Sequence, residues 1–183
     1  MIIGLCGAAG CGKNTVAEML AARHGAGVFA FADPLYAAIS AITGMSVAEL
    51  QDRRHKERDL PWLPASPRRL LQTIGTEWGR ETIHPEIWVM ATMKRIADSE
   101  ATLAVIADVR FDNEAEAIHA SGGYVWRVVR PGAGLAGPAG SHSSERGIRA
   151  GLVDDEVLND GDLSALAGRV DAAWARLQND TMK

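Results

Sequence analysis

The sequence predicts a doubly wound α/β fold, in which a parallel sheet lies between layers of helices. Apolar runs of about five residues, the usual length of a strand, occur at four places: 2–6, 28–32, 103–107 and 124–129. Helical patterns separate these runs, and parallel strands require such crossover connections. The length of 183 residues suits one domain, or one domain with a small lid.

The first helix is expected at 15–23, where Val16, Met19 and Leu20 recur at helical spacing. Capping patterns mark the starts of three further helices: Asp33-Pro34 for a helix to about 42, a capping box at 46–49, and Ser66-Pro67. After the last of these, Leu70, Leu71, Ile74 and Trp78 are spaced to share one helix face.

In the second half, Pro85 is expected to open a helix that runs to about residue 99. A helix at 113–120 would connect the strands at 103–107 and 124–129, and a final amphipathic helix is expected at 162–177. Residues 131–147 are rich in glycine and proline, which predicts a mobile loop that closes over a ligand. We therefore expect a single domain at 1–183 with a lid at 131–147.

Bulk composition narrows the function classes. The formal charge of −4 argues against a nucleic-acid polymer as the partner, because such proteins usually carry a clustered basic face. Cys6 and Cys11 are too few and too close together to form the disulfide framework of a small secreted protein. There is no apolar run of about 18 residues and no secretory signal pattern. We expect a cytoplasmic location without a membrane anchor.

The strongest motif is GAAGCGK, from Gly7 to Lys13, between the first strand and the first helix. It matches GxxxxGK, in which small residues let backbone N–H groups approach phosphate oxygens while the lysine adds a positive charge. The helix N-terminus adds about half a unit of positive charge. The motif predicts binding of ATP phosphates, and a glycine-rich turn with a purely structural purpose is the alternative.

The residue after the lysine is usually a Ser or Thr that binds magnesium, but here it is Asn14, followed by Thr15. Asn14 could bind magnesium weakly or through water. Both residues are also common in the first turn of a helix. The magnesium site therefore rests on Asn14 together with Asp108, which follows a buried strand and could orient the ion through water.

A phosphate-binding loop alone does not distinguish a kinase from a GTPase or a motor ATPase. The chain lacks an evident guanine-specificity signature, and its small size with a lid favours a small-molecule kinase that excludes water. Arginines and hydrogen-bonding residues gather in one segment: Arg68, Arg69, Gln72, Gly75, Thr76, Glu77 and Arg80. Guanidinium groups match phosphate, so this segment could hold the phosphate of an acceptor nucleotide. Exposed surface arginines are the alternative.

A second cluster, DVRFDNE at 108–114, lies where a strand ends and a helix begins, the edge at which open α/β sheets bind ligands. Arg110 could neutralise charge on the transferred phosphoryl group, and Asn113 and Glu114 could contact an acceptor. Helix capping by Asp112 or Asn113 is compatible with the same pattern.

Two single residues lie outside these clusters. Asp33 follows the second strand and could accept a hydroxyl proton or bind a sugar, although helix capping explains it equally well. Trp88 fits a place in the core better than a base-stacking role.

Taken together, several segments resemble the bacteriophage deoxynucleoside monophosphate kinase family over nearly the whole chain: GAAGCGKNT, FADPL, RRLLQTIGTEWGR, PEIWV, ADVRFDNEAEAIHASGG, WRVVRP, HSSE and VLNDGDLSAL. The resemblance implies a P-loop kinase-type three-layer fold. It also implies a transferase that moves the γ-phosphate of ATP to a deoxynucleoside 5′-monophosphate (dNMP) with magnesium. Phage origin would place the protein in the host cytoplasm.

The same resemblance implies site residues. Those for ATP would be Gly10, Cys11, Gly12, Lys13, Asn14 and Thr15, with Arg130 near adenine. Those for the deoxynucleotide would be Arg69, Gly75, Thr76, Trp88, Asp108, Arg110, Asn113 and Glu114. Asn14 replaces the aspartate of the family's GK-Asp-Thr form, and Leu35 and Tyr36 stand where members can carry a lysine.

Two alternatives remain open. The first is a related kinase that acts on a modified base in phage DNA, on phosphomevalonate or on dephospho-coenzyme A. The second is a nucleotide-binding module without catalysis. The sequence leaves the preferred base and the formation of a homodimer undecided.

Overall fold

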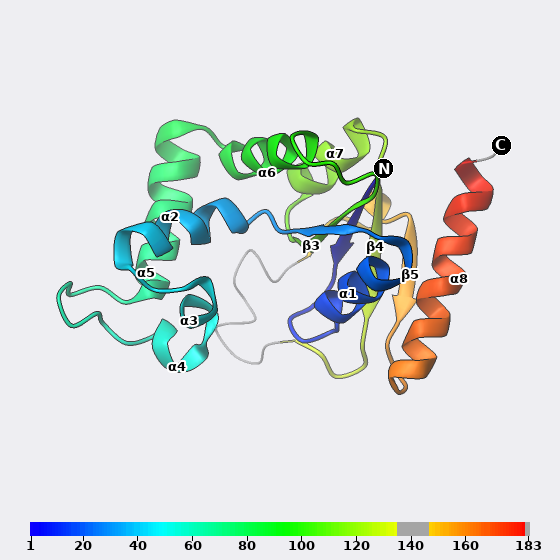
Figure 1. Cartoon of the computed structure of the whole chain (residues 1–183), viewed down its shortest axis with the longest axis horizontal. Coiled ribbons are helices and arrows are strands. Elements are labelled where there is room, and N and C mark those ends of the chain that lie inside the picture. Colours follow the sequence, from blue (N-terminus) through cyan, green and yellow to red (C-terminus); the bar gives the residue numbers. More distant parts are fainter. Residues whose placement is uncertain (135–146, 182–183) are drawn as a thin grey trace. The chain divides into compact units, whose positions relative to one another are not determined.

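The computed structural model describes residues 1–134 and 147–181 (Figure 1). The chain divides into two compact units, one formed by Met1–Ala30 with Ser99–Lys183 and the other by Phe31–Asp98. Most of the lid predicted at 131–147 lies outside the described residues, so the lid and the single-domain organisation stay predictions. Among the described helices, none is both long enough and apolar enough to cross a membrane.

The first unit contains a five-stranded parallel sheet in the order β2-β3-β1-β4-β5. Its strands are β1 (Ile2–Cys6), β2 (Gly27–Phe29), β3 (Ala104–Val109), β4 (Tyr124–Val129) and β5 (Asp155–Leu158). The predicted parallel α/β architecture is confirmed. The strand expected at 28–32 is shorter and begins one residue earlier, and β5 was not expected from the sequence.

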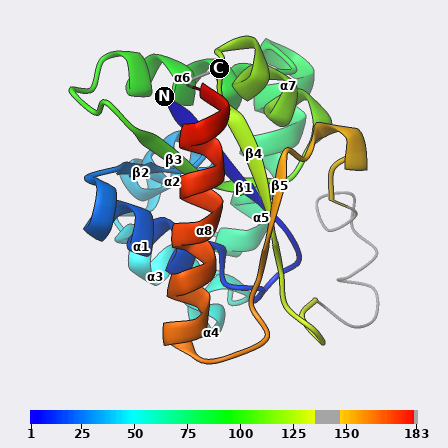
Figure 2. The ribbon, with the colours of Figure 1, turned by 90° about the vertical axis from the view of Figure 1, so that its right-hand side faces the viewer.

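Helices cover both faces of this sheet, as Figure 2 shows. One face carries α1 (Lys13–His24) and α8 (Leu163–Thr181), and the opposite face carries α7 (Asp112–Ala120). A short 3₁₀ turn, η4 (Ala150–Leu152), precedes β5. The predicted helices at 15–23, 113–120 and 162–177 are therefore present, with ends that differ by up to four residues.

Side-chain alternation along the strands explains the two layers. Ile3 and Leu5 belong to the buried cluster that α1 and α8 cover, and Leu20 of α1 belongs to the same cluster. Gly4, between them, faces α7: a Cβ atom there would lie 2.5 Å from Cδ1 of Ile118. The central strand is thus buried on both faces, which fixes the position of the loop that follows it.

The second unit is helical. Its elements are α2 (Asp33–Thr43), α3 (Val47–Gln51), α4 (Arg53–Lys56), α5 (Pro67–Gln72), η1 (Thr73–Ile83) and α6 (Ile87–Ala97). The predicted capping box is confirmed, because the Ser46 N–H donates to Glu49 at 2.8 Å and the Ser46 hydroxyl accepts from the Glu49 N–H at 3.3 Å. The Ser66 hydroxyl likewise accepts from the Arg69 N–H at 3.3 Å.

Two expected helix starts were wrong in detail. Asp33 is the first residue of α2 and does not cap it; its carboxylate instead accepts from Arg95 at 3.3 Å. Pro85 lies two residues before α6, whose N-cap position is Glu86. In both places the proline pattern located the helix but not its first residue.

The segment η1 is a π-helix of 11 residues, a rare conformation with hydrogen bonds that span five residues. The His84 N–H, for example, donates to the carbonyl of Gly79 at 3.0 Å. The π-helix turns more slowly per residue than an α-helix, so the predicted common face of Leu70, Leu71, Ile74 and Trp78 does not persist. Trp78 is 50% exposed.

Packing around Leu20 provides a test of the first unit's core. Leu20 is fully buried, whereas Leu163 at the start of α8 is 68% exposed. We expect Leu20→Ala to lower the free energy of unfolding by about 2–5 kcal/mol, because it leaves a cavity between α1 and the sheet. The matched change Leu163→Ala should cost less than about 0.5 kcal/mol. Urea unfolding followed by circular dichroism measures both, and equal effects would contradict this assignment of the core.

Candidate active site

The loop between β1 and α1 is built around three glycines with positive φ: Gly7 at 136°, Gly10 at 75° and Gly12 at 107°. Side chains disfavour this backbone region. Two of the glycines are also tightly packed. A Cβ atom on Gly7 would lie 2.3 Å from the Val128 carbonyl oxygen, and one on Gly12 would lie 2.5 Å from Nδ2 of Asn159. The motif therefore needs glycine for conformation and for space.

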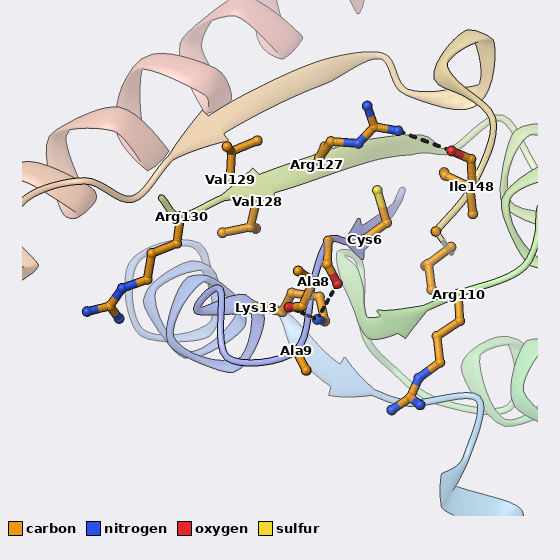
Figure 3. Close-up of a pocket in the computed structure, with 13 residues that line it drawn as sticks. Cys6, Ala8, Ala9, Lys13, Arg110, Arg127, Val128, Val129, Arg130 and Ile148 are labelled. Carbon is orange, nitrogen blue, oxygen red and sulfur yellow. Dashed lines mark hydrogen bonds between the residues drawn. The ribbon is translucent and has the colours of Figure 1, made fainter. Parts of the chain in front are cut away.

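Lys13 folds back over this loop. Its Nζ donates to the carbonyl oxygens of Gly7 at 2.7 Å and Ala8 at 3.1 Å, as the dashed lines in Figure 3 mark. Gly12, at the N-cap position of α1, makes no side-chain cap. The ammonium group thus lies beside the positive end of the helix, where backbone N–H groups lack intrahelical acceptors.

A cavity of about 450 Å³ opens beside the loop. Figure 3 shows three arginines around it, from three different places in the sheet: Arg110 after β3, Arg127 within β4 and Arg130 after β4. Together with Lys13 they give the cavity four cationic side chains, and no acidic side chain of the described residues lines it. The cavity is suited to an anion with several charges.

The position of Arg110 depends on a buried carboxylate. Glu114 is only 2% exposed, and its Oε2 atom accepts from the N–H groups of Arg110 at 2.7 Å and Phe111 at 3.1 Å. The bond from Phe111, the N-cap residue, is the carboxylate half of a capping box; the other half is absent because a phenylalanine side chain has no acceptor. Arg110 itself is exposed, and its guanidinium makes no ion pair with another described residue. The turn thus holds a free cation at the carboxyl end of β3.

Capping by Asp112 or Asn113, the competing interpretation, is wrong because Glu114 caps this helix. Asp112 instead accepts from the Arg149 N–H at 2.9 Å and from its guanidinium at 2.6 Å. These bonds lower the pKa of the Asp112 carboxyl from its ordinary value. Asn113 is half-buried in the first turn of α7.

Arg127 was missed at the level of sequence. Its guanidinium donates to the Ile148 carbonyl at 3.2 Å and lies 3.6 Å from Glu156. It stands in register with Cys6, whose pKa is raised by burial although Arg127 opposes the shift. The sequence feature that could have identified Arg127 as a site residue is a charged side chain within the apolar run 124–129. Two residues after Val125, it lies on the same face of the strand as Val125 and on the face opposite Trp126.

For the metal, the structure places Asn14 exposed in the first turn of α1 and Asp108 near the end of β3. The pairing of β1 with β3 shifts between Gly4 and Cys6, so that Cys6 pairs with Val109 directly after Asp108. Both residues offer oxygen ligands. Over residues 1–134 and 147–181, no group of three or more His, Cys, Asp or Glu residues could hold a metal ion by itself.

The predicted acceptor residues Gly75, Thr76 and Trp88 lie in the helical unit, where the structure brings two of them together. Trp88 is 8% exposed and its Nε1 donates to the Gly75 carbonyl at 2.7 Å. Thr76, next along η1, is exposed. The preference for Trp88 as a core residue is confirmed by its burial.

The two arginines of α5 differ. Arg68 pairs with Glu57 at 2.5 Å, whereas the exposed Arg69 side chain makes no ion pair within the described parts of the chain. Arg69 therefore keeps its charge available, and Arg68 does not. Arg130 is exposed at the end of β4 and lines the cavity.

Comparisons with known proteins agree with this geometry. A family model described as deoxynucleotide monophosphate kinase matches residues 46–170. A protein of Acanthamoeba polyphaga mimivirus, provisionally named a deoxynucleotide monophosphate kinase, is 32% identical over an alignment of 174 positions, and the match covers 86% of this chain and 87% of the relative. The deoxynucleoside-5′-monophosphate kinase of Escherichia phage T5 is 27% identical over an alignment of 227 positions, and the match covers 87% of this chain and 89% of the relative.

Among solved structures, shikimate kinase from Aquifex aeolicus matches with a TM-score of 0.54 at 13% identity, covering 100% of this chain and 99% of that chain. At this identity the likeness shows the fold alone. The predicted P-loop kinase fold is confirmed.

Proposed function

This chain belongs to the deoxynucleotide monophosphate kinase family, and we propose that it transfers the γ-phosphoryl group of ATP to a deoxynucleoside 5′-monophosphate. The observation that carries the proposal is the cavity beside the glycine-rich loop, where Lys13, Arg110, Arg127 and Arg130 meet without an acidic side chain of the described residues. Phosphoryl transfer depends mainly on positioning and on neutralising phosphate charge, which is what this cavity supplies.

The residues present fit the phosphates of ATP. Gly10 has φ of 75° and its missing side chain faces open space, so a phosphate can approach the backbone there. The N-terminus of α1 and the Lys13 ammonium group supply positive charge beside it. We assign phosphate binding to Gly10, Cys11, Gly12, Lys13, Asn14 and Thr15, and adenine contact to Arg130.

The residues also fit magnesium, on the chemistry of their donors. Mg²⁺ prefers oxygen ligands and usually keeps several waters, so it needs only one or two protein ligands besides substrate phosphates. Asn14 and Asp108 are the oxygen donors that we assign to it, directly or through water. When bound, the ion would neutralise charge on the phosphate oxygens.

Arg110 is the residue that we assign to the transferred phosphoryl group. Its guanidinium is unpaired within the described residues, and the Glu114 carboxylate fixes the turn that carries it. Glu114 is buried, so we assign it to holding Arg110 in place instead of the direct acceptor contact expected from the sequence.

On the acceptor side, Arg69 is the candidate for the deoxynucleotide phosphate, because Arg68 is already paired with Glu57. Gly75 and Thr76, in the same helical unit, are assigned to the same ligand, and Trp88 holds the Gly75 carbonyl. Asn113, in the first unit, is assigned separately to an acceptor contact. A phosphate acceptor is largely ionised at neutral pH, since its second pKa is about 6, and so needs no general base. We therefore assign Asp33 to sugar binding, and its proposed catalytic role applies only to a hydroxyl acceptor.

The direct experiment measures ADP release from ATP with each of the common dNMPs in turn. We expect at least one dNMP to stimulate release well above the rate with ATP alone. If none does, the proposed reaction is wrong. Labelled phosphate that enters DNA, phosphomevalonate or dephospho-coenzyme A would identify one of the other acceptors.

Replacement of Arg110 separates catalysis from nucleotide binding. We expect Arg110→Ala to reduce kcat by about 10³-fold or more, because an arginine that stabilises the transferred phosphoryl group contributes on this scale. Arg176→Ala is the matched control, since Arg176 lies on α8 and pairs with Asp155 away from the cavity. A kcat for Arg110→Ala near that of the control would contradict the assigned role. A non-catalytic module would behave differently: Lys13→Ala would weaken its ATP binding, and Arg110→Ala would have no measurable effect.

Asn14 offers a test of the metal site. We expect Asn14→Asp to lower the Mg²⁺ concentration that gives half-maximal activity, because a carboxylate binds Mg²⁺ better than an amide does. Asn179→Asp makes the same charge change at an exposed position of α8 and should leave the Mg²⁺ dependence unchanged. Identical titration curves for the two variants would exclude Asn14 from the metal site.

A further inference from the structure

We infer that Asn159 is a positioning residue for the phosphate-binding loop, a role that rests on the proposed function. Asn159 follows β5 and is 7% exposed. Its Nδ2 donates to the carbonyl oxygen of Cys11 at 2.8 Å, across 148 positions of sequence. Cys11 stands in the middle of the glycine-rich loop, directly before Gly12 and Lys13.

The backbone of Asn159 is itself fixed. Its N–H donates to the Val129 carbonyl at 2.6 Å, which continues the pairing of β4 with β5 one residue beyond Leu158. On the following residue, Asp160 pairs with Arg169 of α8 at 2.5 Å, and Arg169 also donates to the Leu158 carbonyl at 2.7 Å. The amide group thus projects toward the loop from a segment held on both sides.

The bond determines the direction of an N–H group in the loop. The peptide unit between Cys11 and Gly12 is planar and trans, so its C=O and N–H bonds point in opposite directions. Since Asn159 holds the Cys11 carbonyl on its own side, the Gly12 N–H must point away from Asn159. That N–H belongs to the N-cap residue of α1, in the group of donors that bind anions at a helix N-terminus.

The fit between Gly12 and Asn159 makes this role specific. A Cβ on Gly12 would lie 2.5 Å from the Asn159 nitrogen, so the amide packs directly against the missing side chain. Replacing Asn159 by aspartate would turn an acceptor oxygen toward the Cys11 carbonyl oxygen, and replacing it by leucine would leave that carbonyl without its donor. Both changes free the Gly12 peptide to reorient, although the residues of the loop itself are unchanged.

The experiment measures ATP binding to the full chain by titration calorimetry, without an acceptor, together with the KM for ATP and for the dNMP. We expect Asn159→Asp to weaken ATP binding by about 10- to 100-fold, the effect of removing a donor from a buried carbonyl. The KM for ATP should rise accordingly, while the KM for the dNMP changes less than about threefold. Asn179→Asp is the matched control.

Comparison of variants with and without a donor distinguishes positioning from a merely structural bond. Asn159→Asp and Asn159→Leu both remove the donor to the Cys11 carbonyl, whereas Asn159→Ser keeps a shorter one, so ATP affinity should fall for the first two and be partly retained by the third. Urea unfolding of each variant is measured alongside. A variant that is less stable but binds ATP normally would overturn the inference. If Asn159→Asp does not fold, Asn159→Ser, whose hydroxyl is shorter, is measured against Asn159→Leu, and equal ATP affinities would also overturn it.

Failure of the two proposals is distinguishable. If the wild-type protein binds ATP but releases no ADP with any dNMP, the proposed reaction is wrong. The Asn159 inference is then decided by the ATP affinities of the variants alone. Wild-type protein that does not bind ATP would overturn both.

Discussion

The site depends on the close approach of the glycine-rich loop to the strands on one side of it. Gly7 lies against the Val128 carbonyl and Gly12 against Asn159, at distances that no side chain would allow. The loop is thereby fixed at the end of β1, the central strand, which is buried on both faces. These two glycine contacts therefore also fix the positions of Lys13 and of the N-terminus of α1, which directly follow the loop. The cavity and its arginines lie beside them.

Such a concentration of positive charge must be offset by interactions that do not fill the cavity. Lys13 bonds to backbone carbonyls, Arg127 bonds to a backbone carbonyl, and the Arg110 turn is held by Glu114 through backbone N–H groups. These partners hold the cationic residues in position while leaving the cavity free of acidic side chains from the described residues. Electrostatic preorganisation of this kind is the main source of rate enhancement for phosphoryl transfer.

Local patterns predicted the loop and its flanking elements, because the strand, the glycines and the lysine are contiguous in sequence. The features that were missed depend on distant or cooperative contacts. In β5 only Val157 is buried, so the strand exists through its backbone pairing with β4. The π-helical hydrogen bonds of η1 have no simple residue pattern, and they displaced Trp78 from the predicted face. Arg127 gained meaning only once its strand neighbours were known.

The hydrogen bond between Asn159 and Cys11 also constrains when the nucleotide site can be completed. On the ribosome, Cys11 is made 148 residues before its partner. Contacts of such separation form late, because the intervening chain must first be ordered. A nascent chain that already displays β1 and the glycine-rich loop still lacks the donor that orients the Gly12 peptide. The loop therefore reaches its final form only after β5 and Asn159 have been made, long after its own motif.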